Sequence, residues 1–217
     1  MDNLIVLDCE VYPNYFLIAF KNVTTSKVVT FEARGHNNCL SYDDIERIKA
    51  IMSKRITFGF NSLNYDVPIL LYALKSKTCE KIFELSNRII ENNLYNWQTL
   101  KLIGEHSPTW KHIDIMEPTP GVKVSLKLYG GRMHSTRLQD LPYEVGSELT
   151  LEQCDNVKLY CINDLNTTID LYNNVKDRIQ LRIDMSKTYG NIVLSKSDAQ
   201  IAEVVIKSEL RELDETM

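Results

Sequence analysis

The first 33 residues constrain the fold most, because they alternate short β-branched or aromatic runs with turn residues. The run NLIVLD comes first, YFLIAF follows after Pro13 and Asn14, and KVVTFEA follows after a Thr-Thr-Ser turn. Runs of this length, separated by turns this short, predict a three-stranded antiparallel meander.

The residues after the meander indicate that helices join the sheet. Ser41 or Asp43 can cap a helix that runs to about residue 52, with Ile45 and Ile48 on one face. The run RITFGF, residues 55 to 60, then predicts a buried strand. A strand after a helix after a meander indicates an α/β chain with a mixed sheet, antiparallel in the meander and parallel beyond it.

The remaining chain reads as more helices and one more strand. Asp66 and Pro68 open a predicted helix, and a second helical pattern covers residues 79 to 91. Residues 92 to 109 have no clear pattern and are expected to be irregular, and residues 110 to 116 alternate like a strand. A short helix near residues 125 to 128 is expected to end at Gly130 and Gly131. Apolar spacing predicts a long helix over residues 156 to 179 and another over 198 to about 213.

Composition excludes several classes of protein. Hydrophobic residues make up 44% and charged residues 25% of the 217, with only 8 Gly and 6 Pro, so a collagen-like or disordered chain is excluded. No run approaches the roughly 20 apolar residues of a membrane span, and the N-terminus has acids where a signal peptide has basic residues. We therefore expect a cytoplasmic protein with no membrane partner. The five cysteines form no CxxC pair and are expected to be reduced thiols.

Two acids stand at the end of the first predicted strand. Asp8 and Glu10 are two residues apart, so both side chains point to the same face of the strand, while Cys9 points to the other and should be buried. Neighbouring carboxylates repel each other unless a cation lies between them, and a divalent metal is the commonest such cation. A strand that ends at a solvated turn gives the same pattern, so this pair alone does not identify a metal site.

Two further groups of polar residues follow. Asn61, Tyr65 and Asp66 lie in the run NSLNYD, directly after the predicted strand at 55 to 60, although these types also suit an ordinary helix N-terminus. Tyr160 and Asp164 are four residues apart and share one face of the long predicted helix. An aspartate in mid-helix needs either an exposed face or a metal.

In order and type, the three groups resemble the three exonuclease motifs of the DEDDy-type 3′–5′ exonucleases, namely D-x-E, N-x(3)-[FY]-D and Y-x(3)-D. The resemblance spans about residues 3 to 178. This family has the ribonuclease H-like fold and includes the proofreading domains of phage-type DNA polymerases. The resemblance implies a ribonuclease H-like mixed sheet flanked by helices, with an exonuclease domain over residues 1 to 180. Residues 181 to 217 would form a helical extension that packs on this domain or leads to a further module.

The resemblance also implies roles for the acids and the tyrosine. Asp8, Glu10 and Asp164 would hold one Mg²⁺ or Mn²⁺ ion, and Asp8 with Asp66 would hold a second. Donor sets made only of oxygen suit these hard cations. Tyr160 would orient the attacking water, because a phenol with a pKa of about 10 is a weak base at neutral pH.

Nucleic-acid contacts are expected around the acids. By the same resemblance, two residues of the second motif would contact the 3′-terminal nucleotide, although packing is a nearly equal alternative for the tyrosine. An aromatic ring near the first motif could stack on bases, and basic residues between the second and third motifs could neutralise an entering strand, unless they form only a solvated face. The expected contacts are Asn61, Tyr65, Tyr12, Lys123, Lys127 and Arg132.

These expectations lead to a metal-dependent 3′–5′ exonuclease that acts on single-stranded DNA ends, with a polymerase module as a partner in cis or in trans. An RNA-trimming exonuclease of the same fold is an alternative, because two-metal cleavage does not itself distinguish the sugars. A catalytically silent module that binds a polymerase or a nucleic acid is an alternative from another class. Asp114 matches no motif position, and we expect it to be structural or to support the ligands from beside them. We expect the four histidines to be surface or core polar groups and not catalytic ones.

Overall fold

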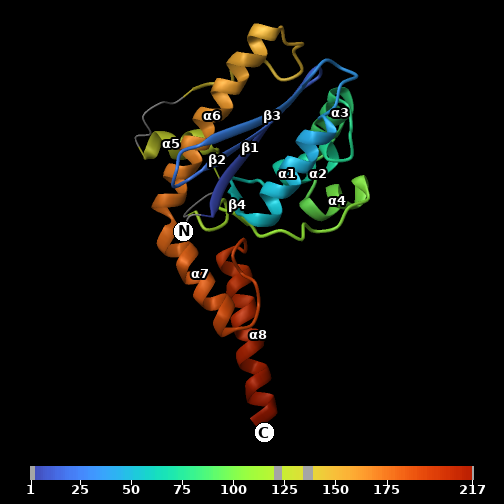
Figure 1. Ribbon diagram of the computed structural model, residues 1–217. Coiled ribbons are helices and arrows are strands. Elements are labelled where there is room, and N and C mark those ends of the chain that lie inside the picture. The colour runs from blue at the N-terminus through green and yellow to red at the C-terminus, as the bar shows by residue number, and fades with distance from the viewer. Residues whose placement is uncertain (1–2, 120–123, 134–138, 217) are drawn as a thin grey trace.

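The computed structural model describes residues 3–119, 124–133 and 139–216. Within them the chain forms a five-stranded mixed sheet with helices on both faces (Figure 1). The strand order is β3-β2-β1-β4-β5. The strands are β1 (Leu4–Tyr12), β2 (Tyr15–Asn22), β3 (Val28–Arg34), β4 (Ile56–Gly59) and β5 (His112–Asp114). The expected α/β class with a mixed sheet is confirmed.

The sheet combines the expected meander with two parallel strands. β1 and β2 pair antiparallel, with Leu7 opposite Phe20, and β2 pairs antiparallel with β3. On its other side β1 pairs parallel with β4, and β4 pairs parallel with β5. The β1–β4 ladder joins only residues 4–6 to residues 56–58, so the second half of β1 has an open edge on this side.

The described part of the chain also contains eight helices. They are α1 (Tyr42–Lys54), α2 (Asp66–Ala73), α3 (Cys79–Glu91), α4 (Asn96–Ile103), α5 (Leu126–Arg132), α6 (Leu151–Asn174), α7 (Lys176–Thr188) and α8 (Asp198–Thr216). Ser41 caps α1 as expected, because its hydroxyl accepts a hydrogen bond of 3.1 Å from the Asp44 N–H.

Helix α6 differs from the helix expected over residues 156 to 179. It begins at Leu151, because Thr150 and Gln153 form a reciprocal capping box there. It ends at Asn174, because Val175 leaves the helical conformation (φ −102°, ψ 9°) before α7 begins. The expected single helix is therefore two consecutive helices.

Helix α4 was not expected, since residues 92 to 109 were predicted to be irregular. The Tyr95 N–H donates to the Gln98 side chain at 2.9 Å, which satisfies one free donor at the start of the helix. Gly104 ends it with a φ of 67°, a conformation that glycine adopts without strain. The helix has only eight residues, with Leu100 and Ile103 buried, so its hydrophobic periodicity is too short to recognise in the sequence.

Helix α5 ends one residue later than expected. It continues through Gly130 and Gly131 to Arg132, whereas the sequence predicted an end at the two glycines. Glycine costs a helix only about 1 kcal/mol relative to alanine. Burial of Tyr129, whose ring lies 5.9 Å from that of Phe60, outweighs this cost.

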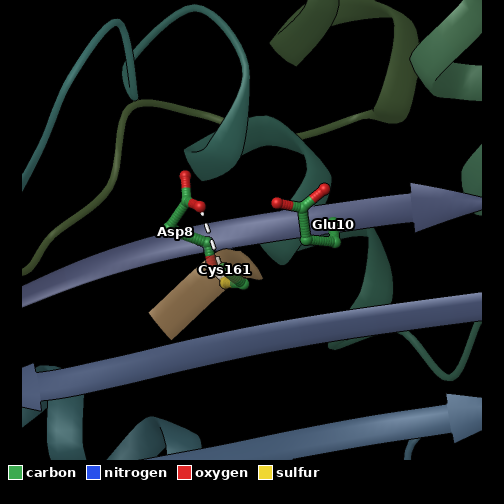
Figure 2. Close-up of side chains that lie close together, drawn as sticks. All are labelled: Asp8, Glu10 and Cys161. Carbon is green, nitrogen blue, oxygen red and sulfur yellow. Dashed lines mark hydrogen bonds between the residues drawn. The ribbon is translucent and has the colours of Figure 1, made fainter. Parts of the chain in front are cut away.

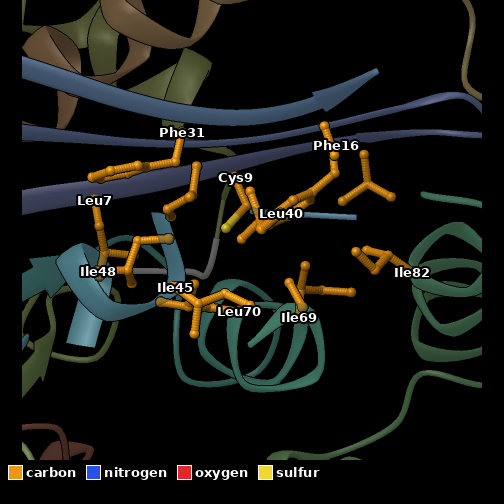
Figure 3. Close-up of a cluster of buried hydrophobic side chains, with 14 of the residues drawn as sticks. Leu7, Cys9, Phe16, Phe31, Leu40, Ile45, Ile48, Ile69, Leu70 and Ile82 are labelled. Carbon is orange, nitrogen blue, oxygen red and sulfur yellow. The ribbon is translucent and has the colours of Figure 1, made fainter. Parts of the chain in front are cut away.

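The two faces of the sheet carry separate apolar cores. The first core joins alternate residues of β1, namely Ile5, Leu7, Cys9 and Val11, to side chains from α1, α2, α3 and α4 (Figure 3). The second core lies between the opposite face and α6, and it includes Val6 and Tyr12 of β1. α6 therefore lies directly over the face of β1 that carries Asp8 and Glu10.

The C-terminal helices extend beyond the sheet and are tied back to it (Figure 1). The Arg182 side chain is 3% exposed and donates to Asp198 at 2.5 Å, which joins α7 to α8. The Ser195 hydroxyl accepts a hydrogen bond of 3.0 Å from the Asp114 N–H at the end of β5. α7 runs through residue 180, where the sequence suggested a domain boundary. None of the helices in the described ranges is long and apolar enough to span a membrane.

Candidate metal centre

The first two acids lie on β1 where its sheet faces α6. The alternation of the strand directs Asp8 and Glu10 to the α6 side, between the core residues Val6 and Tyr12. Cys9 belongs to the opposite core and is 6% exposed, which confirms its expected burial away from the acids. The strand period thus brings two carboxylates into a largely apolar layer.

The acids lie close to the thiol of Cys161, which comes from α6 (Figure 2). The ligand atoms of Asp8, Glu10 and Cys161 all lie within 4.8 Å of one another. The Cys161 thiol donates a hydrogen bond of 3.5 Å to Asp8 Oδ2. Glu10 is only 9% exposed, and among the described residues no hydrogen bond or ion pair reaches its carboxylate.

The third acid, Asp66, comes from the first residue of α2. Its Oδ1 accepts a hydrogen bond of 2.9 Å from the Cys9 N–H, on the edge of β1 that β4 leaves unpaired. Asp66 therefore satisfies a buried backbone donor and is fixed beside β1 by that contact. Its charge raises the pKa values of both Asp8 and Glu10, so it lies within electrostatic range of the pair.

The fourth acid, Asp164, projects from α6 one turn after Tyr160. The side chains of Tyr160 and Asp164 are hydrogen-bonded to each other, as their four-residue spacing allows. The Asp164 charge also raises the pKa values of Asp8 and Glu10. Asp66 and Asp164 therefore lie within electrostatic range of the Asp8 and Glu10 pair, whereas the group with ligand atoms within 4.8 Å of one another, among the described residues, is Asp8, Glu10 and Cys161.

Burial and mutual repulsion disfavour the ionised forms of these four acids. Burial raises the pKa of Asp66 to about 7 and that of Asp164 to about 6. The pKa of Asp8 rises well above its ordinary value through burial first, and then through the charges of Asp66, Glu10 and Asp164. Among the described residues, no Lys or Arg forms an ion pair with any of the four. A divalent cation would supply the missing positive charge.

Asp114 organises the loop between β4 and α2. Its Oδ1 accepts from the Asn61 N–H and its Oδ2 from the Leu63 N–H, both at 3.0 Å. The Asn61 φ of 54° is one that asparagine tolerates better than most residues. The Asn96 side chain, at the start of α4, also donates to the Leu63 carbonyl oxygen. These contacts confirm the structural role expected for Asp114.

His112 holds the same loop from β5. Its Nε2 lies 2.8 Å from the Ser62 hydroxyl and its Nδ1 lies 2.8 Å from the Thr57 hydroxyl. Burial lowers the pKa of His112 to about 4, so the ring is neutral at physiological pH. This histidine is a polar core residue, as expected. Both of its ring nitrogens contact hydroxyl groups, and these contacts support the segment that ends at Asp66.

The residues expected to contact nucleic acid differ in exposure. Tyr12 is 1% exposed and packs in the second core, so the expectation that it stacks on bases is wrong, because no face of its ring is free. Asn61 and Tyr65 line a surface pocket of about 370 Å³ together with Asn64. The Tyr65 hydroxyl lies 2.7 Å from that of Ser86, so this side chain is also held in the fold.

Two of the three expected basic residues lie on α5. Lys127 is exposed on α5 and lines a pocket of about 190 Å³ with Tyr160 and Asp164, although it also pairs with Asp140. Arg132 is exposed at the end of α5. Lys123 lies outside the described residues.

Cys161 is the residue at this site that the sequence interpretation missed, since the cysteines were expected only to be reduced thiols. Its spacing provided a clue, because Cys161 and Asp164 are three residues apart and lie on neighbouring positions of one helix face. A residue beside Asp164 on a helix that covers Asp8 and Glu10 has to approach those acids.

A scan of the sequence against protein-family models found no match, and searches of the curated proteins and of the solved structures found none either. The geometry of the acids and the motifs in the sequence therefore carry the functional argument.

Proposed function

We propose that the chain is a metal-dependent 3′–5′ exonuclease of the ribonuclease H-like fold that removes nucleotides from single-stranded DNA ends. Proofreading for a DNA polymerase, in cis or in trans, is the role that we propose for it. The observation that carries the proposal is that Asp66 of α2 and Asp164 of α6 lie within electrostatic range of Asp8 and Glu10 of β1, and that no Lys or Arg among the described residues forms an ion pair with any of them.

The donor set fits two Mg²⁺ or Mn²⁺ ions. Carboxylate oxygens are the ligands these cations prefer, and the buried Glu10 carboxylate has no other bonding partner in the described chain. Asp8, Glu10 and Asp164 would hold one ion, and Asp8 with Asp66 the other. When bound, such a pair supplies the positive charge that stabilises attack on a phosphodiester and departure of the 3′-oxygen.

Tyr160 would position the attacking water. Burial and the neighbouring acid Asp164 raise its pKa above that of a free phenol, so the hydroxyl keeps its proton at neutral pH. A neutral hydroxyl that is hydrogen-bonded to Asp164 can orient water but cannot remove its proton. We therefore assign Tyr160 a positioning role.

Two pockets beside the acids could hold the ends of a strand. The pocket with Lys127 and Asp164 offers a cation for a phosphate, next to the proposed point of cleavage. The pocket with Asn61, Asn64 and Tyr65 offers amides and an aromatic ring, which suit a nucleobase. The presence of all four acids and the tyrosine supports an active enzyme over a silent module.

The test is digestion of a 5′-labelled single-stranded DNA, and of an RNA of equal sequence, with and without Mg²⁺ or Mn²⁺. We expect a ladder that shortens from the 3′ end only with metal, no product from Asp8→Ala, and about tenfold slower cleavage by Tyr160→Phe. Asp155→Ala is the matched control, since Asp155 is an exposed acid on the same helix, and it should cleave normally. Shortening of RNA alone would replace the DNA substrate by RNA. Normal cleavage by Asp8→Ala, or none by the folded wild type with either metal, would refute the proposal.

A further inference from the structure

The thiol of Cys161 gives the metal centre a donor that an oxygen-only site does not have. Cys161 is fully buried, and its Sγ lies 3.5 Å from Asp8 Oδ2 and 3.8 Å from the Asp8 carbonyl oxygen. Packing of α6 on the sheet holds the sulfur there, between the tyrosine and aspartate of the third motif. The contact therefore follows from the fold and not from a mobile surface side chain.

The separation of the donors is close to that in a small metal site. Zinc bonds to sulfur and carboxylate oxygen are about 2.0 to 2.3 Å long, so ligand atoms around one tetrahedral ion lie roughly 3.3 to 3.8 Å apart. In this protein the ligand atoms of Asp8, Glu10 and Cys161 lie within 4.8 Å of one another. Side-chain adjustments of less than about 1 Å would bring all three to bonding distance.

Glu10 provides a second, independent indication of a ligand. It is 9% exposed, it points to the same side of β1 as Asp8, and its carboxylate has no hydrogen bond or ion pair in the part of the chain that the structure describes (Figure 2). A buried carboxylate without a partner is costly, and a bound cation removes that cost.

We propose that Asp8, Glu10 and Cys161 form a mixed oxygen and sulfur site that binds a thiophilic divalent cation, Zn²⁺ or Cd²⁺. Thiolate sulfur favours these ions over Mg²⁺, which binds oxygen. On coordination the Cys161 thiol loses its proton to solvent, and the sulfur bonds to the ion as a thiolate. No redox step is involved.

This site shares two acids with the proposed catalytic centre, so the two kinds of ion exclude each other. Zn²⁺ or Cd²⁺ held by Asp8, Glu10 and Cys161 would occupy the ligands that a catalytic Mg²⁺ requires. The protein would then be inhibited by thiophilic ions in competition with Mg²⁺. This inhibition rests on the proposed nuclease function, whereas the binding itself does not.

Binding is tested directly with Cd²⁺ as the probe. The variant Cys39→Ser serves as the parent protein, because Cys39 is the exposed cysteine. Titration should produce the ultraviolet band of a cadmium–thiolate bond, and further change of Cys161→Ala should abolish the band and weaken calorimetric Zn²⁺ binding at least about tenfold. Cys154→Ala, a buried cysteine two turns earlier on α6, is the matched control and should keep the band. No band in the parent, or a full band after Cys161→Ala, would overturn the proposal.

Two further measurements separate this inference from the proposed function. Cys161→Ser keeps the side-chain volume and repeats the test if the alanine variant does not fold. Cleavage with Mg²⁺ should be inhibited by Zn²⁺ in the parent protein and at least about tenfold less sensitively after Cys161→Ser. A Cys161-dependent cadmium band in a protein without nuclease activity would uphold this site and refute the nuclease. Nuclease activity without the band would uphold the nuclease and refute this site.

Discussion

The two faces of β1 come from one continuous run of residues and have opposite characters. One face, with Ile5, Leu7 and Cys9, packs against the helices α1 to α4 in an apolar core (Figure 3). The other face also begins with a core residue, Val6, but then carries Asp8 and Glu10 beneath α6. The same strand thus packs in an apolar core on one face and carries carboxylates without a neutralising ion pair on the other.

One face of β1 therefore contributes to stability, and the other carries the residues of the proposed function. The apolar face removes hydrocarbon from water, and each large side chain buried there contributes about 1.5 to 3 kcal/mol. The acidic face brings together like charges whose burial opposes folding, as the raised pKa values of Asp66 and Asp164 record. A cost of this kind is retained where a ligand offsets it, and the divalent cation that we propose would do so here.

The largest expected effect is on the acidic face. Asp8→Asn keeps the shape of the side chain but removes its charge, so we expect cleavage to fall at least about 1,000-fold. The free energy of unfolding without metal should stay the same or rise, because repulsion with Glu10, Asp66 and Asp164 is relieved. Cleavage assays and urea denaturation measure the two effects. A variant that is inactive because it is unfolded would contradict this separation.

The opposite outcome is expected on the apolar face. Leu7 is 2% exposed, and Leu7→Ala should lower the free energy of unfolding by about 2 to 5 kcal/mol through lost burial and a residual cavity. Urea denaturation measures the loss. Leu151→Ala is the control, because Leu151 is 70% exposed and its removal should change stability by less than about 0.5 kcal/mol. Equal losses in the two variants would remove the distinction between core and surface.

A smaller effect is expected at Gly59, where the end of β4 meets the loop that carries Asp66. A Cβ at this position would lie 2.7 Å from the Ser62 Cβ and 3.2 Å from the Leu7 carbonyl oxygen. Gly59→Ala should therefore cost about 1 to 3 kcal/mol of stability and weaken Mn²⁺ binding, because Ser62 and the following turn must shift. Calorimetry with Mn²⁺ and urea denaturation test both effects.

The double variant Gly59→Ala with Ser62→Gly sharpens the test at this loop. It removes the atoms that the new Cβ would meet most closely and should recover part of both losses. Because Ser62→Gly by itself removes the contact with His112, the added cost of Gly59→Ala is measured against Ser62→Gly alone. An added cost as large as in the wild type would show that Gly59 acts in some way other than through Ser62.

The smallest effect concerns pH in metal-free buffer. The pKa of Asp164 is raised to about 6 in the folded protein and is about 4 when unfolded, so the folded state binds more protons between these values. Its contribution therefore makes stability fall as pH rises from about 4 to about 6. Asp164→Asn should show a smaller fall over this window by urea denaturation at several pH values. A fall that is unchanged in the variant would exclude Asp164 as a source.

Much of the fold could be predicted because its signals are local. Alternation and turn residues predicted the meander, and Ser41 predicted the start of α1. The errors occurred where tertiary contacts outweigh local preference. Buried Tyr129 keeps α5 helical through two glycines, and α4 is stabilised at its ends and by packing although its period is too short to recognise.

The candidate site divides in the same way. The acids Asp8, Glu10 and Asp164 could be selected from strand and helix spacing, and the structure brings them together with Asp66. The assignment of Tyr12 as a base contact was wrong. A tyrosine at this position suits a base contact as well as a core position, and it packs in the core.

By itself the sequence determined which side chains share a face, since the periods of a strand and a helix are fixed by backbone geometry. It thereby determined that Asp8 and Glu10 point together and that Tyr160 and Asp164 point together. Only the tertiary structure decided that α6 covers the acidic face of β1 and brings Cys161 to 3.5 Å from Asp8. The reason is that distances between elements depend on how whole side-chain layers pack, and the spacing of residues along one element does not contain that information.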